Sequence, residues 1–339
     1  MRIVSAIQPS GRLHLGNYFG ALQKYIKVQE EGQALFFIAD LHALTTVRNG
    51  QQLQEMTYGL ALDYLAFGLD PKKTILFRQS DVLEHTELAW YLATVAPMGL
   101  LERAHSYKDK VIRGLFPSVG LFAYPILMAA DILLYRADRV PVGKDQMQHL
   151  EIARDLANKF NTAYVLGYDA SDPEGTKEGN APGILTLPSP FFMKDESIVP
   201  GTDGAKMSKS YNNVIEIFAD EAIITKKIMS IKTDSSSVIE PKDMRVSPIF
   251  ALLQLLVTPS EMADIEESCR IGGKGYSTYK HRLLECFYET FRTVRQRRKE
   301  LEGEKGYVKN VLNQGAERAR QYASSTMEDI RKAVGTARK

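Results

Sequence analysis

Two lysines on either side of a serine, on a loop that follows a turn, form the part of this sequence with the clearest chemistry. The pentapeptide KMSKS occupies residues 206–210 and follows the turn-forming run PGTDG at residues 200–204. Two ammonium groups and a hydroxyl on one loop can move together onto a phosphate chain and offset the charge that develops as pyrophosphate leaves. On its own, such a pentapeptide is also found in ordinary solvated basic loops.

A second candidate phosphate-binding element lies near the N-terminus, at residues 8–17. The run QPSG at 8–11 predicts a tight turn, Gly16 lets a ligand approach the backbone, and His14 can donate a proton to a phosphate oxygen. The helix that follows adds free N–H groups and a positive dipole end. The Gly-x-Gly-x-x-Gly spacing is absent, and an ordinary strand-to-helix turn also fits this element alone. With KMSKS downstream, it predicts a nucleotide site in which positioning and electrostatics carry the reaction.

Short apolar strands alternate with helices in the segments that must position these two loops. Residues 3–7, 34–39 and 74–77 are expected to be strands, and helical periodicity lies between them. This order predicts an α/β fold with a parallel, doubly wound (Rossmann-like) sheet whose ligands lie at the carboxyl ends of the strands. A fourth short strand is expected at residues 139–142.

The second part of the chain is helical in pattern and basic in charge. We predict a catalytic domain over residues 1–215, an all-helical domain over 216–325 and a basic tail over 326–339. The net charge is +2, but residues 270–339 contain 17 Lys and Arg against 8 Asp and Glu. This excess favours a polyanionic partner, although solvated helix faces give the same composition.

Composition indicates an ordinary globular protein of the cytoplasm. No apolar run approaches the roughly 20 residues that cross a bilayer, and the N-terminus alternates like a strand rather than a signal peptide. The two cysteines, Cys269 and Cys286, have no partners for a zinc site or a disulfide framework. A reducing compartment is therefore expected.

One carboxylate lies in the most apolar helical run, residues 124–135. Asp131 follows Met128 by three residues and Tyr124 by seven, so the three share one helix face. A carboxylate on an apolar face needs a partner, and an indole N–H, which only donates, suits it. A neighbouring helix that the carboxylate caps, or a lysine, would serve equally well.

The histidine and lysine elements together resemble the two signatures of class I aminoacyl-tRNA synthetases. Further segments resemble the bacterial tryptophanyl-tRNA synthetases: AADILLY at 129–135, VPVGKDQMQH at 140–149, the aspartate and histidine of DLHA at 40–43, and GKGY at 273–276. The resemblance runs in order from residue 7 to about residue 213, and the helical remainder fits it.

This resemblance implies a two-step tryptophan–tRNA ligase. ATP, with Mg²⁺ on its phosphates rather than on protein side chains, would activate L-tryptophan to an adenylate. The product would then pass to the 3′ end of tRNA(Trp), at the 2′-hydroxyl as in class I. The helical domain would hold the anticodon, and the protein would be a homodimer that binds neither membrane nor DNA.

The resemblance also implies roles for individual residues. The catalytic group would be His14, Lys206, Ser208 and Lys209, with Lys110 as an added charge unless it is only a solvated surface lysine. ATP would contact Gln8, Pro9, Ser10, Gly16, Asn17, Gly143, Lys144, Asp145, Ile198, Lys206, Met207, Ser208, Lys209 and Ser210. Tryptophan would contact Asp131 through its indole nitrogen, and Tyr124, Met128, His42 and Gln146 elsewhere.

Three other classes of protein share parts of this sequence pattern. A tyrosyl-tRNA synthetase has both signatures but is expected to carry a tyrosine–aspartate pair and a Gly-Ser-Asp-Gln element. A small nucleotidyltransferase shares only the histidine loop, and a catalytically inactive paralogue would not need to keep His14 and both lysines. The chain departs from the family at Val4, where an aromatic residue is common, and in a longer segment at 167–190.

Overall fold

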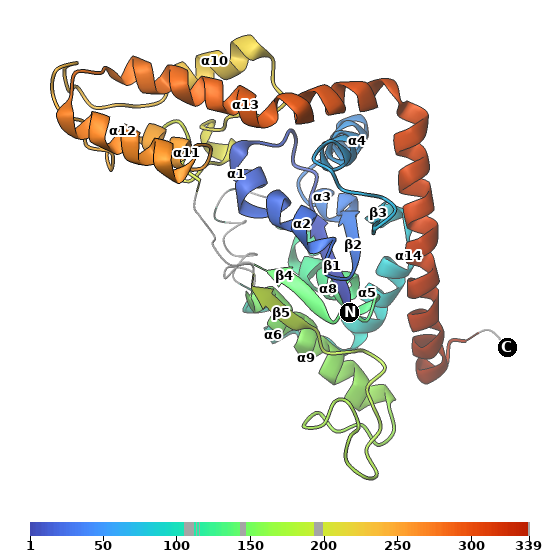
Figure 1. The fold of residues 1–339 in the computed structure, drawn as a ribbon. Coiled ribbons are helices and arrows are strands. Elements are labelled where there is room, and N and C mark those ends of the chain that lie inside the picture. The colour runs from blue at the N-terminus through green and yellow to red at the C-terminus, as the bar shows by residue number, and fades with distance from the viewer. Residues whose placement is uncertain (105–111, 113, 115, 143–146, 193–198, 338–339) are drawn as a thin grey trace.

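A five-stranded parallel sheet forms the centre of the computed structural model, which describes residues 1–104, 112, 114, 116–142, 147–192 and 199–337 (Figure 1). Its strands are β1 (Arg2–Ile7), β2 (Gln33–Ile38), β3 (Thr74–Arg78), β4 (Arg139–Val142) and β5 (Ser189–Phe192). Their order is β3-β2-β1-β4-β5, and each neighbouring pair is parallel. The predicted doubly wound sheet is confirmed, with its topological switch point between β1 and β4.

The strands are apolar because helices cover both faces of the sheet. β2 is buried from Ala34 to Ile38, and the inner residues of β1 are buried as well. The four expected strands are present. The sequence analysis missed β5, a four-residue edge strand that contains Pro190. A proline cannot donate to a ladder, so it weakens the pattern of a strand but is tolerated at a sheet edge.

Helices form two groups, one around the sheet and one beside it (Figure 1). The first group comprises α1 (Leu15–Asn17), the π-helical turn η1 (Tyr18–Leu22), α2 (Gln23–Val28), α3 (Asp40–Ala43), α4 (Gly50–Ala66), the 3-10 turn η2 (Gln79–Asp81), α5 (Glu84–Val95), α6 (Met98–Glu102), α8 (Val119–Leu133), α9 (Met147–Tyr164) and α14 (Lys305–Val334). The second comprises α10 (Glu221–Met229), α11 (Pro248–Gln254), α12 (Pro259–Ile271) and α13 (Tyr276–Gly303), and the 3-10 turn η4 (Lys209–Tyr211) precedes it.

Three apolar clusters hold these layers together. One packs α5, α8, α9 and α14 on one face of the sheet, and another packs α2 and α4 on the other face. The third belongs to the helices α10–α13, yet it also contains Leu15 and Met207. Leu15 comes from the histidine loop (residues 8–17) and Met207 from the lysine loop (residues 200–210). The helical region and both candidate loops therefore share one core.

The last helix, α14, runs along the edge strand β3 (Figure 1). Ala316, Ala319 and Ala323 lie in the same apolar cluster as residues of the sheet. The segment expected to be a basic tail, 326–339, begins inside this helix, where Met327 and Ile330 are fully buried. This packing covers one edge of the sheet, which would otherwise expose unpaired backbone groups. The predicted division at residue 215 stays a prediction.

Replacing Gly315 by alanine is expected to destabilise the protein by about 3 kcal/mol or more. A Cβ at this position would lie 1.8 Å from the Leu76 carbonyl oxygen, so α14 would have to move off strand β3. Differential scanning calorimetry measures the change. Gly306 is the matched control, because it lies on the same helix and a Cβ there meets nothing within 4 Å. Equal melting temperatures for the two variants would contradict this account.

Candidate active site

The carboxyl ends of the parallel strands bring the candidate site residues to one edge of the sheet. Gln8 follows β1, the short helix α3 with His42 follows β2, and Gln79 follows β3. Because these three strands are neighbours, their ends lie side by side next to the switch point. The residues after β4 include Gly143, Lys144, Asp145 and Gln146, which lie outside the described residues, as do Lys110 and Ile198.

The histidine loop and the lysine loop touch each other directly. The Gly16 N–H donates to the Met207 Sδ at 3.3 Å, and the Lys209 Nζ donates to the Ser10 carbonyl at 2.7 Å. Backbone bonds on either side join Leu15 to Ile215 and Ile217 to Leu13. Segments about 190 residues apart in sequence thus form one loop pair at the edge of the sheet.

Glycines make this close approach possible. A Cβ on Gly16 would lie 3.0 Å from the His14 ring and 3.3 Å from the Met207 Cβ. Gly11 has a φ of +95°, which favours glycine, and a Cβ there would lie 3.3 Å from the Lys209 Nζ. Asn17, a predicted ATP contact, accepts the His14 backbone N–H at 3.2 Å and so caps the start of the helix.

His14 is buried and uncharged at neutral pH. Burial and, to a smaller extent, the charge of Lys209 together lower the pKa of His14 to about 4. Its Nδ1 atom is buried and meets no hydrogen-bond partner among the described residues. A neutral imidazole still carries one N–H, so it can donate a hydrogen bond to a phosphate oxygen without adding a charge.

Replacing His14 by glutamine is expected to flatten the pH dependence of stability between about pH 4 and 6.5. In this window the unfolded chain binds more protons than the folded chain, so wild-type stability falls as pH decreases, by about 3 kcal/mol in total. The glutamine variant lacks this contribution. Urea unfolding across the window measures the slope, and His281→Gln, at an exposed position of α13, should keep the wild-type slope. A wild-type slope in His14→Gln would refute the assignment.

The lysine loop is held in shape by a buried asparagine that the sequence analysis missed. The Asn213 Oδ1 accepts the Ser208 N–H at 2.8 Å, and the Asn213 Nδ2 donates to Asp203 Oδ1 at 2.8 Å and to the Lys206 carbonyl at 3.2 Å. A Cβ on Gly201 would lie 2.3 Å from the Asn213 side chain. The turn at residues 200–204 therefore packs around the Asn213 amide, and only the folded loop shows this contact.

The side chains of the lysine loop divide between solvent and core. Lys206 and Ser210 are exposed, whereas Met207 is buried in the third apolar cluster. Burial lowers the pKa of Lys209, against the opposing charges of Glu216 and Asp63. One lysine thus projects freely and the other already lies over the histidine loop, as a clamp on a phosphate chain requires.

A buried ion pair connects the helical region to the histidine loop. The Arg298 Nε in α13 donates to Asp63 Oδ1 in α4 at 2.5 Å. The Leu13 backbone N–H also bonds to this carboxylate. Burial raises the pKa of Asp63 to about 6, although Arg298 lowers it. The sequence offered no sign of this pair, because its members lie 235 residues apart.

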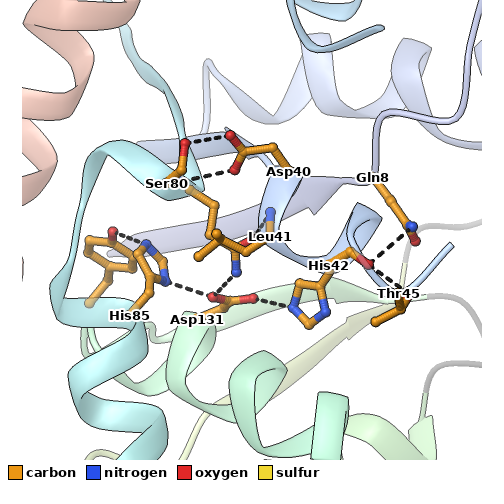
Figure 2. Close-up of polar contacts among 10 residues, drawn as sticks. Gln8, Asp40, Leu41, His42, Thr45, Ser80, His85 and Asp131 are labelled. Carbon is orange, nitrogen blue, oxygen red and sulfur yellow. Dashed lines mark hydrogen bonds and ion pairs between the residues drawn. The ribbon is translucent and has the colours of Figure 1, made fainter. Parts of the chain in front are cut away.

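Asp131 on α8 is the centre of a buried polar cluster (Figure 2). Its Oδ1 accepts from the Gln79 Nε2 at 2.7 Å and from the His85 Nδ1 at 2.6 Å. Its Oδ2 accepts from the His42 Nε2 at 2.8 Å. Burial raises the pKa of Asp131, but the bonds from His42 and His85 outweigh it, so the pKa is lowered and the group stays ionised.

From the sequence, Asp131 could also have capped a neighbouring helix or paired with a lysine. Among the described residues its hydrogen-bond partners are instead His42, Gln79 and His85. Gln79 and His85 were missed, although both follow β3, whose carboxyl end was predicted to lie at the ligand edge. Polar residues directly after a buried parallel strand were the signal that could have identified them.

The other expected tryptophan contacts surround this cluster. The Tyr124 and His42 rings have centroids 6.3 Å apart, and the Tyr124 hydroxyl bonds to the His149 Nε2 at 2.9 Å. Burial raises the pKa of Tyr124 to about 12, so its hydroxyl keeps its proton. Gln8 donates weakly to the His42 carbonyl, at 3.5 Å (Figure 2), and Met128 packs against the apolar cluster around α8.

The fold and the site define a class I aminoacyl-tRNA synthetase core: a doubly wound parallel sheet with a histidine loop and a lysine–serine loop in contact beside its switch point. The sequence matches the family described as tRNA synthetases class I (W and Y) over residues 1–292. The chain belongs to this family.

Relatives match the chain over nearly its whole length. It is 46% identical over 336 residues to the tryptophan–tRNA ligase of Fusobacterium nucleatum, covering 98% of each chain. It is also 46% identical over 335 residues to that of Rhodopirellula baltica, covering 99% of each. Among solved structures, the tryptophanyl-tRNA synthetase of Campylobacter jejuni complexed with ADP and tryptophan has a TM-score of 0.90 and 43% identity, over 99% of this chain and 100% of that one.

Proposed function

We propose that this protein activates L-tryptophan with ATP and ligates it to tRNA(Trp). The observation that carries the proposal is the joint position, at one sheet edge, of the paired loops and the buried Asp131 cluster. A cationic clamp for a triphosphate and a selective acceptor for an indole N–H are the two parts such a reaction needs. The relatives named above support the same substrate.

In the first step, a carboxylate oxygen of tryptophan attacks the α-phosphorus of ATP, and the bond to the β-phosphate oxygen breaks. Lys206 and Lys209 stabilise the negative charge that develops on the departing pyrophosphate. The neutral imidazole of His14 donates a hydrogen bond to a phosphate oxygen. Ser208 donates from its hydroxyl, because the Ser208 backbone N–H is already bonded to Asn213. Lys110 adds charge from its own segment.

ATP lies along the two loops in this proposal. Gln8, Pro9 and Ser10 form the turn under its phosphates, and Gly16 with Asn17 opens the helix beyond. The remaining contacts are Gly143, Lys144, Asp145 and Ile198, with Met207 and Ser210 from the lysine loop. Lysine ammonium groups and N–H donors suit phosphate oxygens rather than a metal ion. Mg²⁺ would therefore be held by the phosphate oxygens of ATP, where it would offset part of their negative charge.

Tryptophan lies over α8, with its indole N–H directed at Asp131. His42, Tyr124 and Met128 flank the ring, and Gln146 holds the amino acid end. A pocket built to accept an N–H rejects phenylalanine, because its carboxylate would be left without that partner. The shape of the pocket must exclude tyrosine.

The aminoacyl group then passes to the 2′-hydroxyl of the terminal adenosine of the tRNA. We propose that residues 216–325 form the domain that holds the anticodon. Part of the basic excess is structural, because Arg318 bonds to carbonyls near β3 and Arg331 to Glu87. The exposed Lys274, Arg292 and Lys299 remain on the helical region for phosphate contacts.

The assay that tests the function is ATP–pyrophosphate exchange across the amino acids. Exchange is expected with tryptophan and not with tyrosine or phenylalanine, followed by charging of tRNA(Trp). Equal exchange with tyrosine would favour a tyrosyl-tRNA synthetase. No exchange with any amino acid would indicate a catalytically inactive paralogue.

We also propose that the protein is a homodimer whose contact lies around α5, α6 and the start of α8. Large apolar side chains are exposed along this stretch: Leu83, Trp90, Met98, Ile112, Phe116 and Val119. These helices are joined through α8, which contacts both α5 and α6. An apolar surface of this kind is typical of an interface between subunits.

Replacing Trp90 by arginine is expected to convert a dimer of 38.0 kDa chains into monomers at micromolar concentration. Trp90 is 70% exposed on α5, and a charge there would be buried without a partner in the interface. Sedimentation velocity measures the state. Ile239→Arg, also at a highly exposed apolar position, should leave the dimer intact. A monomeric wild-type protein would contradict the proposal.

We place the protein in the cytoplasm, where both cysteines stay reduced. Cys269 and Cys286 are free and buried in the helical region. Within the part of the chain that the structure describes, no helix is long and apolar enough to cross a membrane.

A further inference from the structure

The buried side of the Asp131 cluster contains a second histidine, His85. His85 in α5 is fully buried and donates from Nδ1 to Asp131 at 2.6 Å. Its other nitrogen, Nε2, lies 2.7 Å from the Tyr135 hydroxyl. The ring packs between Phe37 and Tyr135, at centroid distances of 5.3 and 5.4 Å. Figure 2 shows His85 on the side of Asp131 away from His42.

The partners on the two ring nitrogens of His85 define its donor and acceptor roles. Burial raises the pKa of Tyr135 well above its ordinary value, and the charge of Asp131 raises it further, so the phenol keeps its proton. The ionised Asp131 can only accept, so the His85 Nδ1 carries a proton and donates to Oδ1, and the Nε2 of the imidazole then accepts from the Tyr135 hydroxyl. In this tautomer His85 is a donor to Asp131, and the order of donation runs from tyrosine to histidine to carboxylate.

The two oxygens of Asp131 are occupied unequally. Oδ1 accepts two bonds, from Gln79 and His85, whereas Oδ2 accepts one described bond, from His42. A carboxylate oxygen accepts about two hydrogen bonds. Gln79 and His85 thus fill Oδ1 and prevent the carboxylate from turning, which leaves Oδ2, on the side of His42, to accept one more donor.

We propose that His85, held by Tyr135, is a positioning residue for amino acid specificity. It fixes Asp131 as an ionised acceptor that presents Oδ2 to the indole N–H. This inference rests on the proposed function, because it requires tryptophan over α8. Without the His85 bond, Asp131 would lose one of the contacts that keep it charged and oriented, and the distinction between an N–H and an isosteric group would weaken.

The test compares tryptophan with 3-(benzothiophen-3-yl)-L-alanine, an isostere in which sulfur replaces the indole N–H. The wild-type protein is expected to favour tryptophan by about 10⁴-fold in kcat/KM for ATP–pyrophosphate exchange. In His85→Leu this ratio should fall at least about 10-fold, while KM for ATP stays within about threefold. His85→Asn, whose amide can donate from near the Nδ1 position, should restore most of the ratio.

Tyr135→Phe provides a milder variant should His85→Leu fail to fold. It removes only the hydroxyl, and a severalfold loss of discrimination is expected. Tyr25→Phe is the matched control, because it deletes another buried hydroxyl on the opposite face of the sheet, and it should leave the ratio unchanged.

The outcomes separate this inference from the function on which it rests. If the wild-type protein shows no preference for tryptophan over the isostere, the indole assignment of Asp131 fails. If wild type discriminates and both His85→Leu and Tyr135→Phe discriminate equally well, only the positioning role fails. A loss of activity that affects tryptophan, the isostere and ATP alike would also overturn it, since that is the effect of a merely structural residue.

Discussion

Replacing Asp131 by asparagine is expected to lower kcat/KM for tryptophan by about 1000-fold, with KM for ATP within about threefold of wild type. Asp131 is only 4% exposed and accepts from three donors. An amide removes the negative charge and places an N–H2 group against at least one of those donors. Under the proposed function, the change therefore weakens the recognition of tryptophan and leaves the lysine and histidine loops unaltered. Exchange kinetics with each substrate varied in turn measure the two effects.

Asp40→Asn is the matched control for this experiment. Asp40 is also a buried carboxylate at the same sheet edge, but it bonds to Ser80 and not to the His42 cluster (Figure 2). Asp40→Asn should leave kcat/KM for tryptophan, relative to KM for ATP, as it is in the wild-type protein. Equal losses for tryptophan and ATP in Asp131→Asn would mean that Asp131 supports the fold rather than the substrate.

Replacing Lys209 by alanine is expected to reduce kcat for exchange by about 100- to 1000-fold. The Lys209 Nζ lies 2.7 Å from the Ser10 carbonyl, over the loop on which the phosphates would lie. In the proposed reaction its charge stabilises the departing pyrophosphate, so we expect the loss to fall on the transition state and not on tryptophan binding. Isothermal titration calorimetry should give a tryptophan Kd close to that of wild type.

Lys226→Ala tests whether the effect belongs to the position or to any nearby lysine. Lys226 is exposed on α10, the helix that follows the lysine loop, and its loss should change kcat by less than about twofold. A similar kcat loss in both variants, or a large loss of tryptophan affinity in Lys209→Ala, would rule out the assigned role.

Local patterns in the sequence were sufficient to predict the fold class and to single out the two candidate phosphate-binding loops. Short, mostly apolar runs predicted β1 to β3, because the inner residues of strands covered on both faces are largely buried. Turn residues and the paired lysines predicted the loops, because these properties belong to contiguous residues. Among the strands of the described residues, only β5 was missed, since four residues with a proline give too little pattern.

Contacts between distant segments could not be predicted in this way. The sequence indicated that Asp131 needs a partner, but its partners His42, Gln79 and His85 come from three other segments. The same holds for the bond from Gly16 to Met207. Which pairs meet depends on strand order and helix packing, and no short window of residues contains that information.

The sequence by itself determined which chemical groups this protein has available: two lysines and a histidine suited to a phosphate chain, and one carboxylate on an apolar helix. The tertiary structure decided how that chemistry is arranged. It brings the lysine loop against the histidine loop, because both contribute residues to one apolar core. It also directs His85 to the Oδ1 of Asp131, while Oδ2 lies on the side of His42. The physical reason is that residue type sets what a group can donate or accept, whereas packing alone sets which groups remain to bind a substrate.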